Sequence, residues 1–138
     1  MKLPLRIVVA DDELDMRDFF RRMLERSGHH VISVAENGRQ LVQQCHELKP
    51  DLVISDVRMP EMDGLEAAAT IFHERPVPVV LVSAHHDERS LKGMDHVMAL
   101  LAKPFTYSEL EIAIGNALRG FRERHPSSNG DSNAAKSG

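Results

Sequence analysis

The stretch LVISDVRMPEMDG, Leu52–Gly64, places an aspartate directly after four residues suited to a buried strand. Burying an unpaired carboxylate costs several kcal/mol, on the order of the desolvation penalty of one ion. Asp56 is therefore expected where the strand ends and solvent, a cation or a reaction begins. Taken alone, the same aspartate is also explained as the start of a turn in MPEMDG, so the rest of the chain has to decide.

Short runs rich in Val and Ile alternate with amphipathic stretches along the chain. The runs that we predict as strands are Leu5–Ala10, His30–Ala35, Asp51–Ser55, Val77–Ser83 and Val97–Ala102. Such alternation is typical of an α/β fold, in which a parallel sheet is covered by helices. The run His30–Ala35 is the most polar of the five and is predicted at an edge of the sheet.

Apolar residues at helical spacing predict five helices, through Met16–Leu24, Leu41–Leu48, Leu65–Phe72, Asp87–Met94 and Leu110–Phe121. Gly28 follows the first helix where a C-terminal glycine is expected, and Asp63 is placed to cap the third. Thr106 and Glu109 form a T-x-x-E capping box before the fifth.

Length and composition indicate one globular domain. The 138 residues are 42% hydrophobic and carry a net charge of -4, which gives no electrostatic footprint for nucleic acid. Cys45 is the single cysteine, and no apolar run is long enough to span a membrane, so we expect a cytoplasmic protein. The domain is predicted over residues 1–124, and the Ser-, Asn- and Gly-rich residues 125–138 are predicted to be a disordered tail.

Polar residues follow four of the five predicted strands. Because the carboxyl ends of parallel strands meet at one edge of the sheet, these residues are expected to converge there. They are Asp11, Asp12 and Glu13 after the first strand, Asp56 after the third, Ser83 at the end of the fourth and Lys103 after the fifth. Clustered carboxylates repel one another unless a divalent cation neutralises them, and oxygen ligands favour Mg²⁺.

This set of residues suits phosphoryl transfer. An aspartate can act as a nucleophile and form an acyl phosphate, while a metal, a hydroxyl and an ammonium stabilise the phosphoryl oxygens. We therefore predict Asp56 as nucleophile, Asp11 and Asp12 as metal ligands, Ser83 as a hydroxyl contact and Lys103 as the countercharge. Each residue has an ordinary structural explanation by itself, and it is their coincidence at strand ends that favours the functional interpretation.

Four motifs, VVADDE, KPDLVISDVRMPEMDG, LVSA and LAKPF, occur together between Leu5 and Arg124. With them the chain resembles the receiver domain of two-component response regulators, and is similar in kind to the stand-alone receivers of chemotaxis and sporulation relays. The resemblance implies a flavodoxin-like, doubly wound sheet of five parallel strands in the order 2-1-3-4-5, flanked by five helices.

The resemblance also implies roles for the acidic residues. Asp56 matches the phosphoacceptor, Asp12 the direct Mg²⁺ ligand and Asp11 its acidic partner, with Mn²⁺ as an alternative ion. Arg58 matches the residue whose backbone carbonyl binds the metal, so the implied metal set is Asp11, Asp12, Asp56 and Arg58.

On the phosphoryl side, Ser83 matches the switch hydroxyl, Ala84 lies next to it, and Lys103 matches the lysine that pairs with the phosphoryl group. In the family the peptide bond after this lysine is usually cis, so Lys103–Pro104 is expected to be cis.

Three positions concern rate and switching. Arg58 and His85 match the positions that tune access of water to the acyl phosphate, and are candidates for setting its lifetime. Leu100 stands where the family commonly has an aromatic switch residue, so the usual coupling between hydroxyl and ring is in doubt. Output is then expected to pass through the loop after Ser83, the helix Asp87–Met94 or Phe105.

The function implied is a phosphorylation switch rather than a turnover enzyme. The phosphoryl group would come from the phosphohistidine of a sensor histidine kinase or a histidine phosphotransfer protein. The product would act in trans on a protein target or relay the phosphate, as a monomer or a phosphorylation-dependent dimer. Met16, Arg17 and Phe20 of the first helix are expected to contact the phosphodonor.

Two other functions use the same fold or the same aspartyl phosphate chemistry. A phosphohydrolase with an aspartyl phosphate ordinarily has a second aspartate two residues after the nucleophile, where this chain has Arg58. A phosphorylation-independent interaction module of the same fold is the remaining alternative, against which the intact acidic set argues.

Overall fold

The computed structural model describes residues 4–84 and 99–125. Its strands are β1 (Arg6–Ala10), β2 (His30–Ala35), β3 (Leu52–Asp56), β4 (Val79–Ser83) and β5 (Ala99–Ala102). They form one parallel sheet in the order β2-β1-β3-β4-β5, which confirms the predicted topology. β2 is an edge strand, as its polar sequence predicts.

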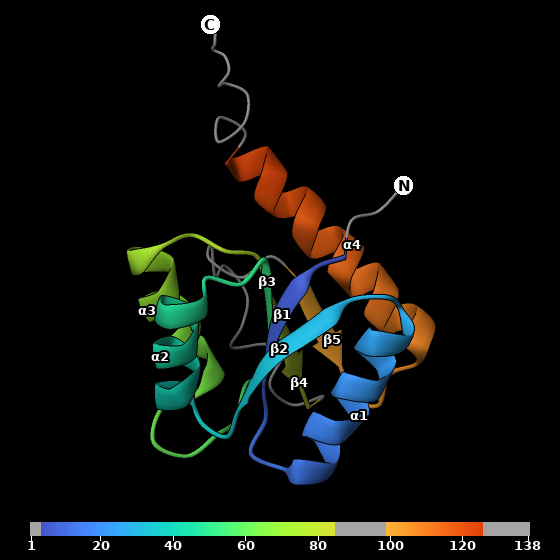
Figure 1. Cartoon of the computed structure of the whole chain (residues 1–138), viewed down its shortest axis with the longest axis horizontal. Coiled ribbons are helices and arrows are strands. Elements are labelled where there is room, and N and C mark those ends of the chain that lie inside the picture. Colours follow the sequence, from blue (N-terminus) through green and yellow to red (C-terminus); the bar gives the residue numbers. More distant parts are fainter. Residues whose placement is uncertain (1–3, 85–98, 126–138) are drawn as a thin grey trace, which may run out of the picture.

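Four helices lie in the described residues: α1 (Leu14–Arg26), α2 (Gly38–Leu48), α3 (Gly64–Glu74) and α4 (Tyr107–Arg124). α1 and α4 cover one face of the sheet, and α2 and α3 cover the other (Figure 1). α4 corresponds to the fifth predicted helix. The predicted helix Asp87–Met94 lies outside the described residues, as does the predicted tail apart from His125.

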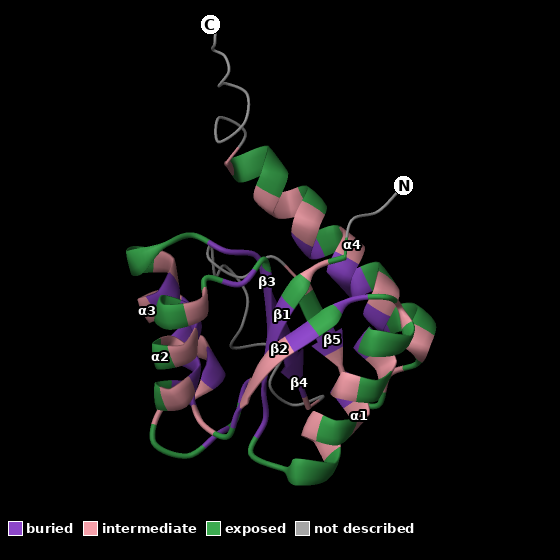
Figure 2. Ribbon diagram, viewed as in Figure 1, coloured by how far each residue is buried: buried purple, intermediate pink, exposed green. Residues whose placement is uncertain are grey.

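Each face of the sheet carries its own hydrophobic core. Along β1, Ile7 and Val9 pack with α1 and α4, while Val8 and Ala10 pack with α2 and α3. Figure 2 shows that the central strands are largely buried, that the edge strands β2 and β5 are only partly buried, and that the outer surfaces of the helices are exposed. Because both faces are covered, most positions of the central strands β1, β3 and β4 are apolar, and these strands therefore appear in the sequence as nearly continuous hydrophobic runs.

Three helix ends follow the predicted capping residues. Gly28 has a φ of 91° just after α1, a conformation that glycine adopts without steric cost. The side chains of Asp63 and Thr106 each accept a hydrogen bond from the backbone of a glutamate three residues on, which completes two capping boxes.

β3 extends one residue further than predicted, because Asp56 still pairs with Val82 of β4 and the next residue, Val57, donates its N–H to the Val82 carbonyl. The carboxyl group of Asp56 is thus held by regular sheet structure rather than by a loop. No helix in residues 4–84 or 99–125 combines the length and apolar character needed to cross a membrane.

Candidate functional site

Three aspartates meet at the carboxyl edge of the sheet. One carboxylate oxygen from each of Asp11, Asp12 and Asp56 lies within 4.8 Å of the others. β1 and β3 are hydrogen-bonded neighbours, so residues at their ends are brought side by side although they are far apart in sequence. Asp11 and Asp56 are buried and Asp12 is exposed, so the cluster opens to solvent on one side.

Asp11 is held by three hydrogen bonds. Its N–H donates to the Ala35 carbonyl at 3.0 Å, its Oδ1 accepts from the Glu13 N–H at 2.9 Å, and its carbonyl accepts from the Arg17 guanidinium at 2.8 Å. Its Oδ2 is buried and has no hydrogen-bond partner among the described residues. A buried carboxylate oxygen of this kind fits a cation ligand.

The electrostatics of the cluster also fit a cation. Burial, the neighbouring Asp56 and, more weakly, Asp12 raise the pKa of Asp11 to about 6, against the lowering effects of its backbone hydrogen bond and of Lys103. Burial likewise raises the pKa of Asp56, opposed mainly by Lys103. Both carboxyl groups would be stabilised in their charged form by a divalent ion.

Lys103 is the cation that the structure places beside Asp56. Its Nζ lies 3.4 Å from Asp56 Oδ1, which also accepts the Val57 N–H at 3.0 Å. The Asp56 side chain is 11% exposed and that of Lys103 is 31% exposed, so the pair is partly shielded from solvent. The Lys103–Pro104 peptide bond is cis, as expected.

Ser83 completes the rim. It is the last residue of β4, its carbonyl accepts the Lys103 N–H at 2.9 Å, and it pairs with Ala102 of β5. Its hydroxyl is fully buried, and within residues 4–84 and 99–125 it finds no hydrogen-bond partner. An unpaired buried hydroxyl is costly in free energy, so it is suited to a ligand that completes its hydrogen bonding.

The loop after Asp56 depends on a close approach that sequence reasoning did not single out. The Gly64 N–H donates to the Val57 carbonyl at 2.7 Å, and a Cβ at this glycine would lie 2.2 Å from the Asp56 carbonyl oxygen. The Ser55 hydroxyl donates to that same oxygen at 2.9 Å. The available signal was a glycine directly after the capping residue Asp63.

An apolar groove of about 470 Å³ borders the site. Its lining comes from α1, from the residue after Ser83 and from the segment after β5: Met16, Phe19, Ala84, Lys103, Pro104 and Phe105. The prediction that Phe20 contacts the phosphodonor is wrong. Its side chain is buried and stacks on Phe105 at 5.5 Å, because it points into the core between α1 and the sheet.

The other predicted site residues have different surroundings. Glu13 occupies the N-cap position of α1 and is not in the aspartate cluster. Arg58 is exposed, two residues after Asp56. Leu100 lies in β5 beside Leu81 and is 42% exposed, while His85 lies outside the described residues.

The sheet order and the acidic rim define a doubly wound signalling domain of the receiver type. The family model described as the response regulator receiver domain matches residues 7–115, and the chain belongs to this family of two-component signalling proteins.

Curated relatives and solved structures agree with this. The transcriptional regulatory protein PdtaR of Mycobacterium tuberculosis is 39% identical over 124 residues, which are 88% of this chain and 60% of PdtaR, so the chain spans less than two thirds of that relative. A response regulator receiver domain protein from Clostridium thermocellum superposes with a TM-score of 0.77 at 29% identity, covering 85% of this chain and 95% of that one. NtrX from Brucella abortus has a TM-score of 0.81 at 25% identity, over 91% of this chain and 30% of NtrX.

Proposed function

We propose that the protein is a phosphorylation switch that accepts a phosphoryl group on Asp56. The observation that carries this is the convergence at one rim of a buried Asp56, the Lys103 ammonium 3.4 Å from it and a buried Ser83 hydroxyl that lacks a partner among the described residues. An ion pair alone would need no unpaired hydroxyl beside it. A phosphoryl group on Asp56 would bring oxygens that both Lys103 and Ser83 can reach.

In the proposed reaction, an Asp56 carboxylate oxygen forms a bond to the phosphorus of a phosphohistidine while the P–N bond breaks and its electron pair returns to the imidazole. Lys103 and Ser83 donate hydrogen bonds to the phosphoryl oxygens as the group moves. Later attack by water on the phosphorus would return Asp56 and release phosphate. The chain is in this proposal a switch that assists its own modification, not a turnover enzyme.

Asp11, Asp12 and Asp56 would hold Mg²⁺, with Mn²⁺ as an alternative, and the backbone carbonyl of Arg58 is proposed as a further ligand. The bound ion would offset the negative charge of the transferred group. The buried Asp11 Oδ2 and the raised pKa values of Asp11 and Asp56 support this assignment.

The first prediction tests the phosphoacceptor. Incubation with Mg²⁺ and acetyl phosphate is expected to add one base-labile phosphoryl group to the wild-type protein, detected by intact-mass spectrometry. The Asp56→Asn variant, nearly identical in shape, should gain none. If the wild type binds Mg²⁺ but stays unmodified, the alternative of a phosphorylation-independent interaction module takes its place.

We further propose that the apolar groove receives the phosphodonor, a sensor histidine kinase or histidine phosphotransfer protein. Lys103 and Ala84 line the groove, and in this proposal they also belong to the phosphoryl site, so a protein that delivers a phosphoryl group to Asp56 would cover the groove. Its apolar lining suits the apolar face of a helix. A phosphohistidine donor is charged from ATP, so the proposal retains the cytoplasmic location expected from the sequence.

The second prediction separates docking from chemistry. Met16→Glu places a charge in the groove and should slow phosphoryl transfer from a phosphohistidine protein about tenfold or more, as expected for loss of an apolar interface contact. Phosphorylation by acetyl phosphate should be unchanged, since this small donor needs no docking surface and Met16 is not one of the residues proposed to bind the phosphoryl group. Ile112→Glu, at a position 61% exposed on α4, is the control and should transfer normally. Equal slowing with both donors would contradict docking at the groove.

A further inference from the structure

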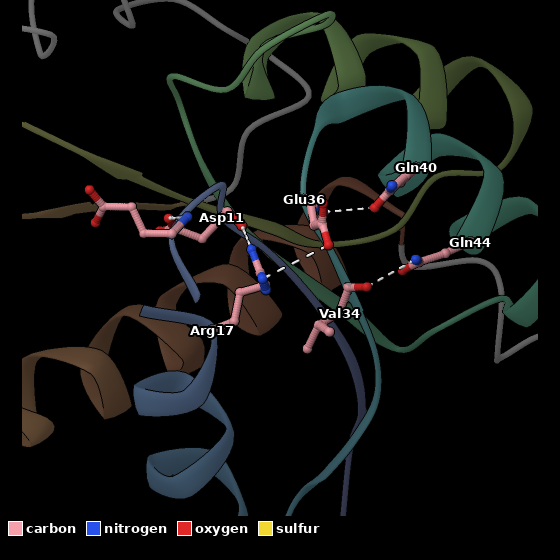
Figure 3. Close-up of polar contacts among 7 residues, drawn as sticks. Asp11, Arg17, Val34, Glu36, Gln40 and Gln44 are labelled. Atoms are coloured by element: carbon pink, nitrogen blue, oxygen red, sulfur yellow. Dashed lines mark hydrogen bonds and ion pairs between the residues drawn. The ribbon is translucent and has the colours of Figure 1, made fainter. Parts of the chain in front are cut away.

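Arg17 is a largely buried arginine in the first turn of α1. Only 11% of its side chain is exposed. Arginine is rarely buried without partners, because removing its charge from water costs free energy that hydrogen bonds must offset. Its guanidinium points between the ends of β1 and β2 (Figure 3).

The Arg17 guanidinium interacts with two groups. One nitrogen, Nη1, donates to the Asp11 carbonyl at 2.8 Å, and the other, Nη2, lies 3.9 Å from Glu36 Oε2. The Glu36 backbone N–H in turn donates to Gln40 of α2 at 2.8 Å. Arg17 therefore connects α1 to the loop after β1 and to the loop after β2, and through the latter to α2.

The contact with Asp11 bears on the acidic cluster. The Asp11 N–H and Oδ1 are hydrogen-bonded to Ala35 and Glu13, and the Arg17 guanidinium donates a hydrogen bond to the Asp11 carbonyl. Three of the four polar atoms of Asp11 are thus fixed in place, and the remaining one, Oδ2, is the buried oxygen without a partner in the described part of the chain. The direction of Oδ2 depends on these three bonds.

We propose that Arg17 is a positioning residue that orients Asp11 for Mg²⁺; the inference rests on the proposed function of the acidic cluster. Mg²⁺ requires near-ideal octahedral geometry, whereas Ca²⁺ accepts variable geometry and longer bonds. Groups that hold metal ligands in place commonly change metal affinity by about 10–100-fold when removed. Loss of Arg17 should therefore weaken Mg²⁺ binding more than Ca²⁺ binding.

The positive charge of Arg17 affects metal affinity in the opposite direction from its positioning role, and this difference makes the proposal testable. A guanidinium near the site repels any divalent cation. If this repulsion were its only effect, removing the guanidinium would tighten the binding of Mg²⁺ and of Ca²⁺ to the same extent. A general loosening of the fold would weaken both together. Only a positioning role lowers the preference for Mg²⁺ over Ca²⁺.

The test is isothermal titration of the metal-free protein with Mg²⁺ alone and with Ca²⁺ alone, well below the unfolding temperature. Arg17→Gln is expected to bind Mg²⁺ about 10-fold more weakly while Ca²⁺ affinity changes by less than about 3-fold. Arg17→Lys, which keeps the charge and reaches one partner, should recover part of the Mg²⁺ affinity. The matched control is Arg21→Gln, one turn further along α1, where the arginine side chain is 42% exposed and pairs with Glu25; its affinities should equal those of the wild type.

An equal change in Mg²⁺ and Ca²⁺ affinity, in either direction, would overturn the positioning role. Because Arg17→Lys is measured as well, the test stands even if Arg17→Gln does not fold. If the wild type itself fails to bind Mg²⁺, the metal site is absent and the proposed function falls together with this inference. Wild-type binding with an unchanged Mg²⁺ preference in both Arg17 variants would remove the inference alone.

Discussion

Gly64→Ala is expected to destabilise the protein by about 3 kcal/mol or more, at the upper end of what overpacking a well-packed site costs. The new Cβ would lie 2.2 Å from the Asp56 carbonyl oxygen and 3.1 Å from the Ser55 hydroxyl. Both neighbours belong to β3 in the middle of the sheet, so neither can move without disturbing its strand pairing. The start of α3 would have to move away from Asp56.

Urea unfolding measures this effect, and the chain offers a matched control. Gly115 lies inside α4, and a Cβ there would meet nothing within 4 Å. Gly115→Ala should therefore stabilise the protein by about 0.5–1 kcal/mol through helix propensity. Similar unfolding midpoints for the two variants would show that α3 does not need its close approach to Asp56.

The second large effect concerns Asp11 and pH. In the metal-free protein its pKa is about 6, against an ordinary value of 3.8, chiefly because the carboxyl group is buried. The folded state therefore binds this proton more tightly than the unfolded state between these values. The contribution of Asp11 to stability is present in full below pH 3.8 and is lost as the pH rises through about 6. The loss is on the order of 3 kcal/mol by proton linkage.

Asp11→Asn removes the titrating group, and this variant is expected to be more stable than the wild type at pH 7.5 by about 1–3 kcal/mol. At pH 4 the two proteins should be closer in stability. Thermal and urea unfolding in EDTA at both pH values give the comparison, with the exposed Asp18→Asn as control, expected within about 0.5 kcal/mol of the wild type.

With Mg²⁺ present, the wild type should be more stable than Asp11→Asn at pH 7.5. Saturating Mg²⁺ would stabilise the wild type at pH 7.5, where Asp11 is charged, and should stabilise Asp11→Asn much less, since an amide is a weaker ligand for a hard cation. A difference between wild type and Asp11→Asn that is the same at pH 4 and at pH 7.5 would contradict the electrostatic origin of the effect.

The sequence by itself was sufficient for the α/β class and for three of the helix ends, while the strand order 2-1-3-4-5 was an expectation from the family resemblance. Continuous Val and Ile runs are required wherever both faces of a strand are covered, and capping residues such as Asp63 and Thr106 act within one turn of chain. The convergence of Asp11, Asp56 and Lys103 could be predicted for a related reason, because parallel topology places all carboxyl ends at one edge of the sheet.

Only the tertiary structure decided which residues of α1 lie in the core, which line the groove and which contact the acidic cluster. Met16 and Phe20 have the same apolar character, yet Met16 lines a groove and Phe20 fills the core. Arg17, predicted as a contact for a partner, connects Asp11 to Glu36, and its contact with a partner stays a prediction. The physical reason is distance along the chain: capping and strand propensity are local, whereas these environments depend on packing between segments that the sequence separates.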